Sequence, residues 1–294
     1  MAEGLLEATV RLTSAMEALA ALAAHVRIQT EGIAVDPEIA ASLATVAEHL
    51  LGDAHIAASD PAPQAIGMTR ALLRESIALV EDPTRTGSWS TPDPAVIQGV
   101  GRLSMAIAPV IATAAGQLAG LAAALAEPGS RILDVGTGSG WLAIALARTF
   151  PSANVVGIDV YEPALELARV NIAAEDLADR ISLVSSDVTD FVSDEPFDAV
   201  WLPLPFLPRA IVPAAIRQAA SLLRSGGWLL PGTFAGPGDE LSRLLTDLRI
   251  RRSGGHPWPA EEIVTMVAAA GLTDVVEVPR SWPAPLRLYA GRTI

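Results

Sequence analysis

The chain has 294 residues, a formal net charge of −13 and no cysteine, and all 20 of its Lys and Arg positions are arginine. These counts exclude disulfides, thiolate metal sites, cysteine nucleophiles and lysine Schiff bases. The excess of acids disfavours nucleic acid as a partner, because affinity for a phosphate backbone rests on clustered cations. A cysteine-free chain whose first residues lack a basic region ahead of an apolar core is expected in the cytoplasm.

The first part of the chain predicts helices and no strands. Apolar residues at helical spacing begin at Leu5 and continue toward Gly32, and similar patterns occupy Pro37–Leu51 and Met68–Val80. Segments rich in proline and glycine separate these helices. We therefore expect an all-helical N-terminal domain over residues 1–115.

The uncharged segment Ser104–Ala126 is long enough to cross a membrane. It consists largely of alanine and glycine, contains Pro109 and Gln117, and has no flanking arginine cluster to orient it. A buried helix fits this composition better, so we expect no membrane partner.

Strands and helices alternate from about residue 131 onward. The predicted strands are RILDV (131–135), NVVGIDV (154–160), ISLVSSD (181–187), FDAVWL (197–202) and GGWLLPG (226–232). The predicted helices are 141–149, 163–174, 209–223, 239–248 and 259–270. The last two strands, 273–278 and 285–290, are expected to form an antiparallel hairpin edge, because no helical crossover separates them.

This alternation predicts an α/β fold. We expect a Rossmann-like, seven-stranded, mostly parallel sheet with helices on both faces, which occupies residues 116–294 and follows the all-helical domain.

The stretch LDVGTGSGW, Leu133–Trp141, joins the first predicted strand to the helix after it. Gly136, Gly138 and Gly140 allow a tight turn and close approach of a ligand to the backbone, at the start of a helix whose free N–H groups attract negative charge. The third glycine comes one residue too early for the dinucleotide pattern G-x-G-x-x-G. Asp134, directly before the turn, would repel a pyrophosphate and suits a ligand that carries an ammonium group.

Two further carboxylates follow the next two strands. Asp159 ends the second predicted strand, where its oxygens can accept hydrogen bonds from both hydroxyls of a ribose. Asp187 ends the third, where it can accept from an adenine amino group. Three acids at three consecutive strand ends predict an adenosine-containing ligand at this edge of the sheet.

From about Arg131 to Ile294 the chain resembles a class I S-adenosylmethionine-dependent methyltransferase. The motifs that carry the resemblance are LDVGTGSG, VVGIDV, SSDV, FDAVWLPLP and LLRSGGWLL. The resemblance implies S-adenosylmethionine as cofactor and gives its binding residues: the three glycines on its methionine part with Asp134 nearby, Asp159 on the ribose, Val160 against the adenine, and Asp187 with Val188 at the adenine edge. We also assign Thr137 and Trp201 to the cofactor site.

The helical domain ahead of such a sheet is similar to that of small-molecule O-methyltransferases. The resemblance implies that residues 1–115 cover the substrate and pair two subunits into a homodimer. Those enzymes usually carry a catalytic histidine shortly after the fourth strand, where this chain reads WLPLPFLPR, Trp201–Arg209, without one. No catalytic residue is therefore assigned from the sequence, and the candidate for a base is His256, in a loop rich in glycine and proline.

An activated sulfonium can react through positioning alone, so a base is not required. We predict methyl transfer to the oxygen, nitrogen or carbon of a small, partly apolar metabolite, with no metal. The predicted substrate-binding residues are Trp89, Gln98, Met105, Pro203, Pro205 and Phe206. PLPF at 203–206 only partly resembles the polar residue, Pro-Pro and aromatic of amine and amide methyltransferases. The alternatives are a peptide or protein substrate, a cofactor-binding protein with another role, and a nicotinamide-dependent oxidoreductase.

Overall fold

The computed structural model describes residues 4–52, 62–84, 93–235 and 238–294. The chain divides into two compact units, Met1–Glu81 and Asp82–Ile294. The division lies earlier than the boundary that we predicted between residues 115 and 116. The reason is that Ala108, Val110 and Ile111 are buried in the same core as the sheet, so their helix belongs to the second unit.

The first unit consists of three described helices, α1 (Leu5–Glu31), α2 (Pro37–Leu51) and α3 (Ala62–Glu81). Gly32 ends α1 in the left-handed conformation, and the Asp36 side chain caps α2 by accepting from the backbone N–H groups of Glu38 and Ile39. The helix α3 begins at Ala62, ahead of the predicted start at Met68. The buried core of this unit is small, formed by Val26, Ala62 and Ile66 with Leu22 packed against it.

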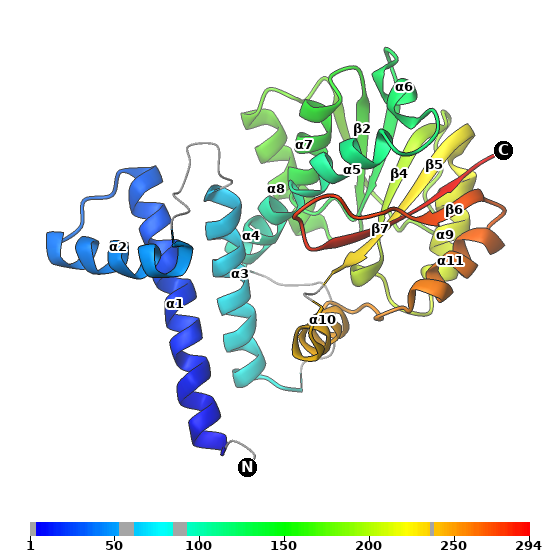
Figure 1. Ribbon diagram of the computed structural model, residues 1–294. Coiled ribbons are helices and arrows are strands. Elements are labelled where there is room, and N and C mark those ends of the chain that lie inside the picture. Colours follow the sequence, from blue (N-terminus) through cyan, green and yellow to red (C-terminus); the bar gives the residue numbers. More distant parts are fainter. Residues whose placement is uncertain (1–3, 53–61, 85–92, 236–237) are drawn as a thin grey trace. The chain divides into compact units, whose positions relative to one another are not determined.

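The second unit is built on a seven-stranded sheet in the order β3-β2-β1-β4-β5-β7-β6 (Figure 1). Its strands are β1 (Arg131–Val135), β2 (Asn154–Asp159), β3 (Ile181–Ser185), β4 (Phe197–Pro203), β5 (Leu223–Phe234), β6 (Thr273–Glu277) and β7 (Leu286–Arg292). The first five are parallel, and β7 pairs antiparallel with both β5 and β6. The predicted Rossmann-like sheet and its antiparallel edge are confirmed.

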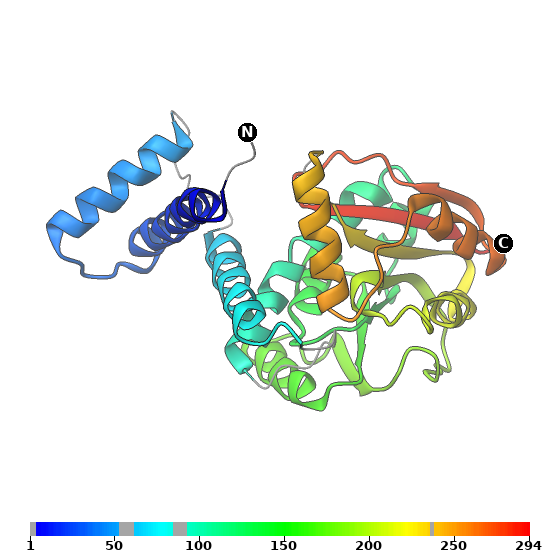
Figure 2. The ribbon, with the colours of Figure 1, turned by 90° about the horizontal axis from the view of Figure 1, so that it is seen from below.

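Helices cover both faces of this sheet (Figures 1 and 2). Side chains alternate along each strand, so neighbours such as Ile132 and Leu133 enter separate cores. One core holds apolar residues of α5 (Ile107–Ala115), α6 (Leu121–Ala126), α7 (Trp141–Thr149) and α8 (Glu162–Ala174), and the other those of α9 (Val212–Ser221) and α11 (Ala260–Ala269). The remaining helices are α4 (Pro94–Ser104), the short 3-10 helix η1 (Leu204–Phe206) and α10 (Glu240–Arg252).

The apolar segment 104–126 is not one helix. It is divided among the end of α4, α5 and α6, and the buried residues of α5 and α6 lie in the core beside α7. Among the described residues, the stretch Pro94–Ala115 is long and apolar enough to cross a membrane by length and composition, with a mean hydropathy of 1.5. In the structure 28% of its most apolar 18-residue window is buried, and the buried residues of α5 lie in the core beside the sheet.

Candidate active site

The glycine-rich turn between β1 and α7 lies at the carboxyl edge of the sheet. Its three glycines have positive φ angles of 67° at Gly136, 55° at Gly138 and 79° at Gly140, a region that residues with a Cβ avoid. A Cβ added at Gly138 would meet nothing closer than the Gly136 carbonyl oxygen at 4.0 Å. The backbone at Gly138 therefore faces open space that a ligand can enter.

Gly140 has a different role from the other two glycines. A Cβ there would lie 3.0 Å from the Cβ of Ala168 on α8. The missing side chain lets α7 and α8 pack closely, so Gly140 contributes to packing at the end of the turn. A direct contact with a cofactor's methionine part, as we predicted, belongs more naturally to Gly136 and Gly138.

Asp159 ends β2 directly opposite the turn. Its Oδ2 accepts a hydrogen bond from the Gly138 N–H at 2.8 Å, and its Oδ1 accepts from the Tyr161 N–H at 2.9 Å. Burial raises the pKa of Asp159, and these backbone hydrogen bonds oppose the shift. Each carboxylate oxygen can accept a second hydrogen bond, so both hydroxyls of a ribose can still bind.

The residues predicted to bind adenine differ in how accessible their side chains are. Val160 is 67% exposed beside Asp159 and offers an apolar surface to a flat ring. Asp187 follows β3, and its Oδ1 accepts from both the N–H and the hydroxyl of Thr189 at 2.8 and 2.7 Å. The side chain of Val188 is buried in the core, so a contact from that residue to a ligand would come from its backbone.

Asp134 is fully buried at the end of β1. Its Oδ2 accepts a hydrogen bond from the Thr137 hydroxyl at 2.8 Å. Burial raises the pKa of Asp134 to about 7, the Thr137 hydrogen bond opposes the shift, and the charge of Asp159 adds to it. A cation bound beside Asp134 would favour its ionised form and reverse this shift.

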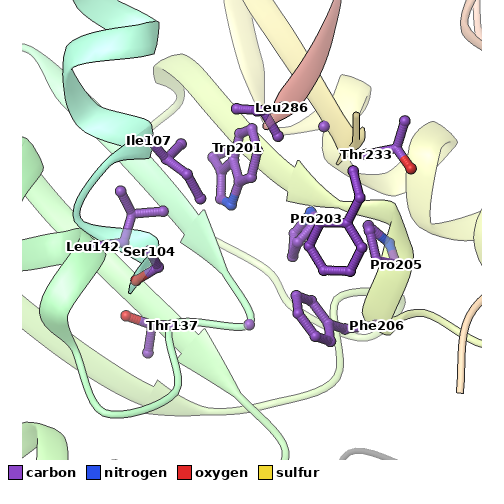
Figure 3. A pocket seen from close by; sticks show the side chains of 13 residues that line it. Ser104, Ile107, Thr137, Leu142, Trp201, Pro203, Pro205, Phe206, Thr233 and Leu286 are labelled. Atoms are coloured by element: carbon purple, nitrogen blue, oxygen red, sulfur yellow. The ribbon is translucent and has the colours of Figure 1, made fainter. Parts of the chain in front are cut away.

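A cavity of about 70 Å³ begins at the turn and extends past the end of β4 (Figure 3). Its lining residues are Ser104, Ile107, Gly136, Thr137, Leu142, Trp201, Pro203, Pro205, Phe206, Gly232, Thr233, Phe234 and Leu286. None of these thirteen carries a charge or a histidine ring. The cavity is therefore an apolar space that shares Gly136 and Thr137 with the glycine-rich turn.

A protein family described as a methyltransferase domain matches residues 132–227, the segment that holds the turn, Asp159, Asp187 and the end of β4. Residues 132–227 form a methyltransferase domain. The predictions of a class I methyltransferase and of S-adenosylmethionine as its cofactor are confirmed at the level of this domain.

Curated relatives of the methyltransferase domain differ in what they modify. A release factor glutamine methyltransferase from Gloeobacter violaceus is 34% identical over 143 residues, which cover 40% of this chain and 50% of that protein. A tRNA1(Val) (adenine(37)-N6)-methyltransferase from Vibrio campbellii is 41% identical over 73 residues, 25% of this chain and 30% of that protein. The chain thus spans half or less of the length of these relatives.

Solved structures share the fold over the whole chain. An O-methyltransferase family protein from Burkholderia thailandensis has a TM-score of 0.66 at 19% identity, with 99% of both chains covered. Human N-acetylserotonin methyltransferase in complex with S-adenosylmethionine has a TM-score of 0.65 at 13% identity, also with 99% of both chains covered. At these identities the likeness shows the fold alone. The N-terminal helices and the sheet of this chain follow the same fold as these proteins.

The residues of the methyltransferase domain fit the cofactor. The open backbone at Gly138 admits it, the spare acceptor capacity of Asp159 matches a ribose, and buried Asp134 matches a cationic group. The exposed side chain of Val160 matches the face of an adenine ring. These residues would hold S-adenosylmethionine with its methionine part toward the cavity.

His256 lies outside the cavity lining. Its ring packs edge-on against Trp258 at 4.7 Å between centroids, and burial, with the charges of Arg209 and Arg251, lowers its pKa. A Cβ on Gly255 would overlap the backbone carbonyl of Pro205, so this loop packs tightly behind the cavity wall. The role of His256 as a base stays a prediction.

Only some of the predicted substrate-binding residues line the cavity. Pro203, Pro205 and Phe206 line the cavity, whereas Gln98 and Met105 do not. The Gln98 Oε1 accepts from Trp141 Nε1 at 2.6 Å and from Asn171 Nδ2 at 3.1 Å, and its Nε2 donates to Asn171 Oδ1 at 3.1 Å. Gln98 therefore fastens α4 to α7 and α8. Met105 packs against the core, and Trp89 lies outside the described residues.

Sequence reasoning missed several cavity residues, namely Ser104, Ile107, Leu142, Gly232, Thr233, Phe234 and Leu286. Gly232, Thr233 and Phe234 close β5, and the rule that ligands bind at the carboxyl ends of parallel strands could have found them. Leu286 starts an antiparallel strand, where that rule gives no signal. Within the described ranges, no group of three or more His, Asp and Glu side chains is placed to hold a metal ion.

The raised pKa of Asp134 predicts a pH dependence of cofactor binding. The folded protein without ligand keeps a proton on Asp134 up to about pH 7, whereas the carboxyl of the unfolded chain ionises near 3.8. Stability from this group therefore falls as pH rises from 3.8 to about 7. A bound cation needs the ionised form, so affinity for S-adenosylmethionine should be about tenfold lower at about pH 6 than at about pH 8.

Isothermal titration calorimetry across this pH range measures the effect, and Asp134→Asn provides the control because it removes the titrating group. That variant should bind more weakly and with a flat pH profile. An equally steep profile in Asp134→Asn would assign the pH dependence to another group.

Proposed function

We propose that this protein transfers a methyl group from S-adenosylmethionine to a small, partly apolar molecule. The observation that carries the proposal is the apolar cavity that opens from the glycine-rich turn through Gly136 and Thr137. Its walls include Ile107, Leu142 and Phe206. A compact acceptor with apolar surface suits these walls.

When bound, S-adenosylmethionine supplies a methyl group on a sulfonium sulfur: the acceptor's electron pair forms the new bond to carbon, the carbon–sulfur bond breaks, and sulfur keeps that pair. The protein's part is alignment and exclusion of water. Pro203 and Pro205 give the wall after β4 a fixed backbone, and Phe206 meets Phe234 edge-on at 5.9 Å between ring centroids. None of the thirteen described lining residues can take a proton. We therefore infer that the acceptor loses its proton to water or reacts without losing one first.

A second candidate is a peptide or protein substrate, which the 34% identity to a release factor glutamine methyltransferase favours. The residue at the end of β4 favours a small-molecule substrate. Pro203 stands where amide methyltransferases carry a polar side chain, and it has no group with which to hold a planar amide. The net charge of −13 disfavours a tRNA substrate on electrostatic grounds.

Transfer of radiolabelled methyl groups tests the proposal. The purified protein is incubated with methyl-labelled S-adenosylmethionine and, separately, with small phenols, enols and amines, with release-factor peptides and with tRNA. Label that enters only the small-molecule pool supports the proposal. Label in peptide or tRNA alone would replace it with the corresponding alternative.

We also propose that the first unit pairs two subunits. The side chains of Leu5, Leu6, Val10 and Leu12 on α1 are 87%, 77%, 61% and 51% exposed. Val26 is the buried residue of this 27-residue helix. Long apolar faces of this kind are typical of surfaces that another chain covers.

We expect sedimentation equilibrium to give a dimer for the wild-type chain and a monomer for the double variant Leu5→Arg, Leu12→Arg. The matched control is Val192→Arg, because Val192 is 79% exposed in the second unit and should leave the dimer intact. A monomeric wild type at about ten micromolar would contradict this proposal.

A further inference from the structure

Trp201 and Thr233 are the two buried polar side chains of the described cavity lining that make no hydrogen bond to the described protein. The side chain of Trp201 is only 3% exposed, and its indole N–H makes no hydrogen bond within the described part of the chain. Figure 3 shows the indole nitrogen at the end of the ring that faces Leu142, Ser104 and Thr137. The fully buried side-chain nitrogen and oxygen atoms without a partner in the described chain are Trp258 Nε1 and the Tyr289 hydroxyl oxygen, so the Trp201 nitrogen is open to the cavity and a ligand there can accept from it.

The position of this ring is fixed by its surroundings. Trp201 lies on β4 between Asp134 of β1 and Leu230 of β5 in the strand register. A Cβ on Gly232 would overlap the six-membered part of the indole. The absence of that side chain gives the ring its place, so the N–H has a set direction before any ligand binds.

Two of the three hydroxyl groups in the cavity lining already donate their protons within the protein. The Ser104 hydroxyl donates to the Gly101 carbonyl at 2.6 Å, and the Thr137 hydroxyl donates to Asp134 at 2.8 Å. The Thr233 hydroxyl points away from the indole (Figure 3). Among the described lining side chains, Trp201 and Thr233 are therefore the donors left for a ligand, and the Trp201 nitrogen is the one that faces Ser104 and Thr137.

We infer that the indole N–H of Trp201 donates a hydrogen bond to the acceptor oxygen of the substrate, and that this substrate is a flat, apolar molecule with a readily ionised hydroxyl, such as an acidic phenol or an enol. The inference rests on the proposed function. A hydrogen bond to a charged oxygen is stronger than one to a neutral group. Because none of the described lining residues is a base, the acceptor's proton goes to water, and a donor that favours the oxyanion stabilises this reactive form of the acceptor.

The probe for this site is 4-nitrophenol, whose visible absorbance distinguishes the phenol from the phenolate. The protein is first loaded with S-adenosylhomocysteine, and binding is measured for the wild type and for Trp201→Phe. We expect Trp201→Phe to lower the affinity for the phenolate by about tenfold. The same variant should raise the ionisation midpoint of the bound probe by about one pH unit. 4-Nitrotoluene has the same shape without the oxygen and should bind both proteins equally.

Two further variants separate donation from packing. Trp201→His restores a ring N–H and should recover part of the phenolate affinity. Phe206→Leu changes a cavity wall without removing a donor, so it should weaken 4-nitrophenol and 4-nitrotoluene alike. Equal effects of Trp201→Phe on both probes, or no binding of the phenolate to the wild type, would overturn the inference.

Failure of the proposed function is detected separately, because label from S-adenosylmethionine would then enter peptide or tRNA and no small molecule, whatever the effect of Trp201→Phe on 4-nitrophenol binding. If Trp201→Phe does not fold, as judged by thermal unfolding, the wild type labelled with ¹⁵N-tryptophan replaces it. A downfield shift of one indole proton on addition of 4-nitrophenolate, and none with 4-nitrotoluene, supports the inference, and the absence of such a shift contradicts it.

Discussion

Replacement of Gly138 by valine is expected to weaken S-adenosylhomocysteine binding by more than about 100-fold. Gly138 has a φ of 55°, which a β-branched residue adopts only with strain, and an added side chain would enter the open space beside the turn. The turn would have to rearrange, and its N–H would leave Asp159. Isothermal titration calorimetry with S-adenosylhomocysteine measures the loss.

Gly129→Val is the matched control for this effect. Gly129 also has a positive φ, 79°, and no atom lies within 4 Å of the position of an added Cβ. Both variants should lose stability through backbone strain, but Gly129→Val should keep its affinity within about twofold. A similar loss of affinity in the two variants would show that strain alone, and not the space at Gly138, explains the result.

Replacement of Asp159 by alanine is the second large effect, an expected loss of about 100-fold in affinity for S-adenosylhomocysteine. The change removes an acceptor for two ribose hydroxyls and also the partner of the Gly138 N–H, which is held at 2.8 Å. Because burial raises the pKa of Asp159, its removal also eliminates a costly buried charge. The loss of binding should therefore exceed any loss of stability.

Asp190→Ala tests whether charge alone accounts for that loss. Asp190 is exposed and follows the same strand as Asp187, so its removal makes the same change in net charge near the edge of the sheet. We expect less than about twofold change in affinity, because exposed charges are screened by solvent and salt. Equal effects of the two alanine variants would contradict a direct bond from Asp159 to the ribose.

Periodicity in the sequence was enough to predict the sheet and to locate the strand ends at which the cofactor site is predicted. Strand and helix periods differ, so the alternation after residue 131 was enough to predict seven strands and the antiparallel edge. The turn around Gly138 and the acids Asp134, Asp159 and Asp187 were predicted to form one site for a related reason. Parallel strands bring their carboxyl ends to one edge, so residues far apart in sequence but equivalent along each strand must meet there.

Other features were decided only by tertiary packing. The boundary between the units moved to Glu81 and Asp82 because α5 enters the core of the sheet. Gln98 was predicted to bind substrate, yet its amide is hydrogen-bonded to Trp141 and Asn171. Helical spacing alone gives no direction for a side chain relative to other elements, so sequence could not separate these alternatives.

For the same reason, the residues on the substrate side of the site could not be predicted from the sequence. Leu286 reaches the cavity from an antiparallel strand. Gly232 contributes by lacking a side chain, because the ring of Trp201 occupies that space. Neither residue lies in a motif near the glycine-rich turn. A cofactor site built from strand ends can be predicted from periodicity, whereas a cavity formed by side chains from distant segments exists only once those segments have packed together.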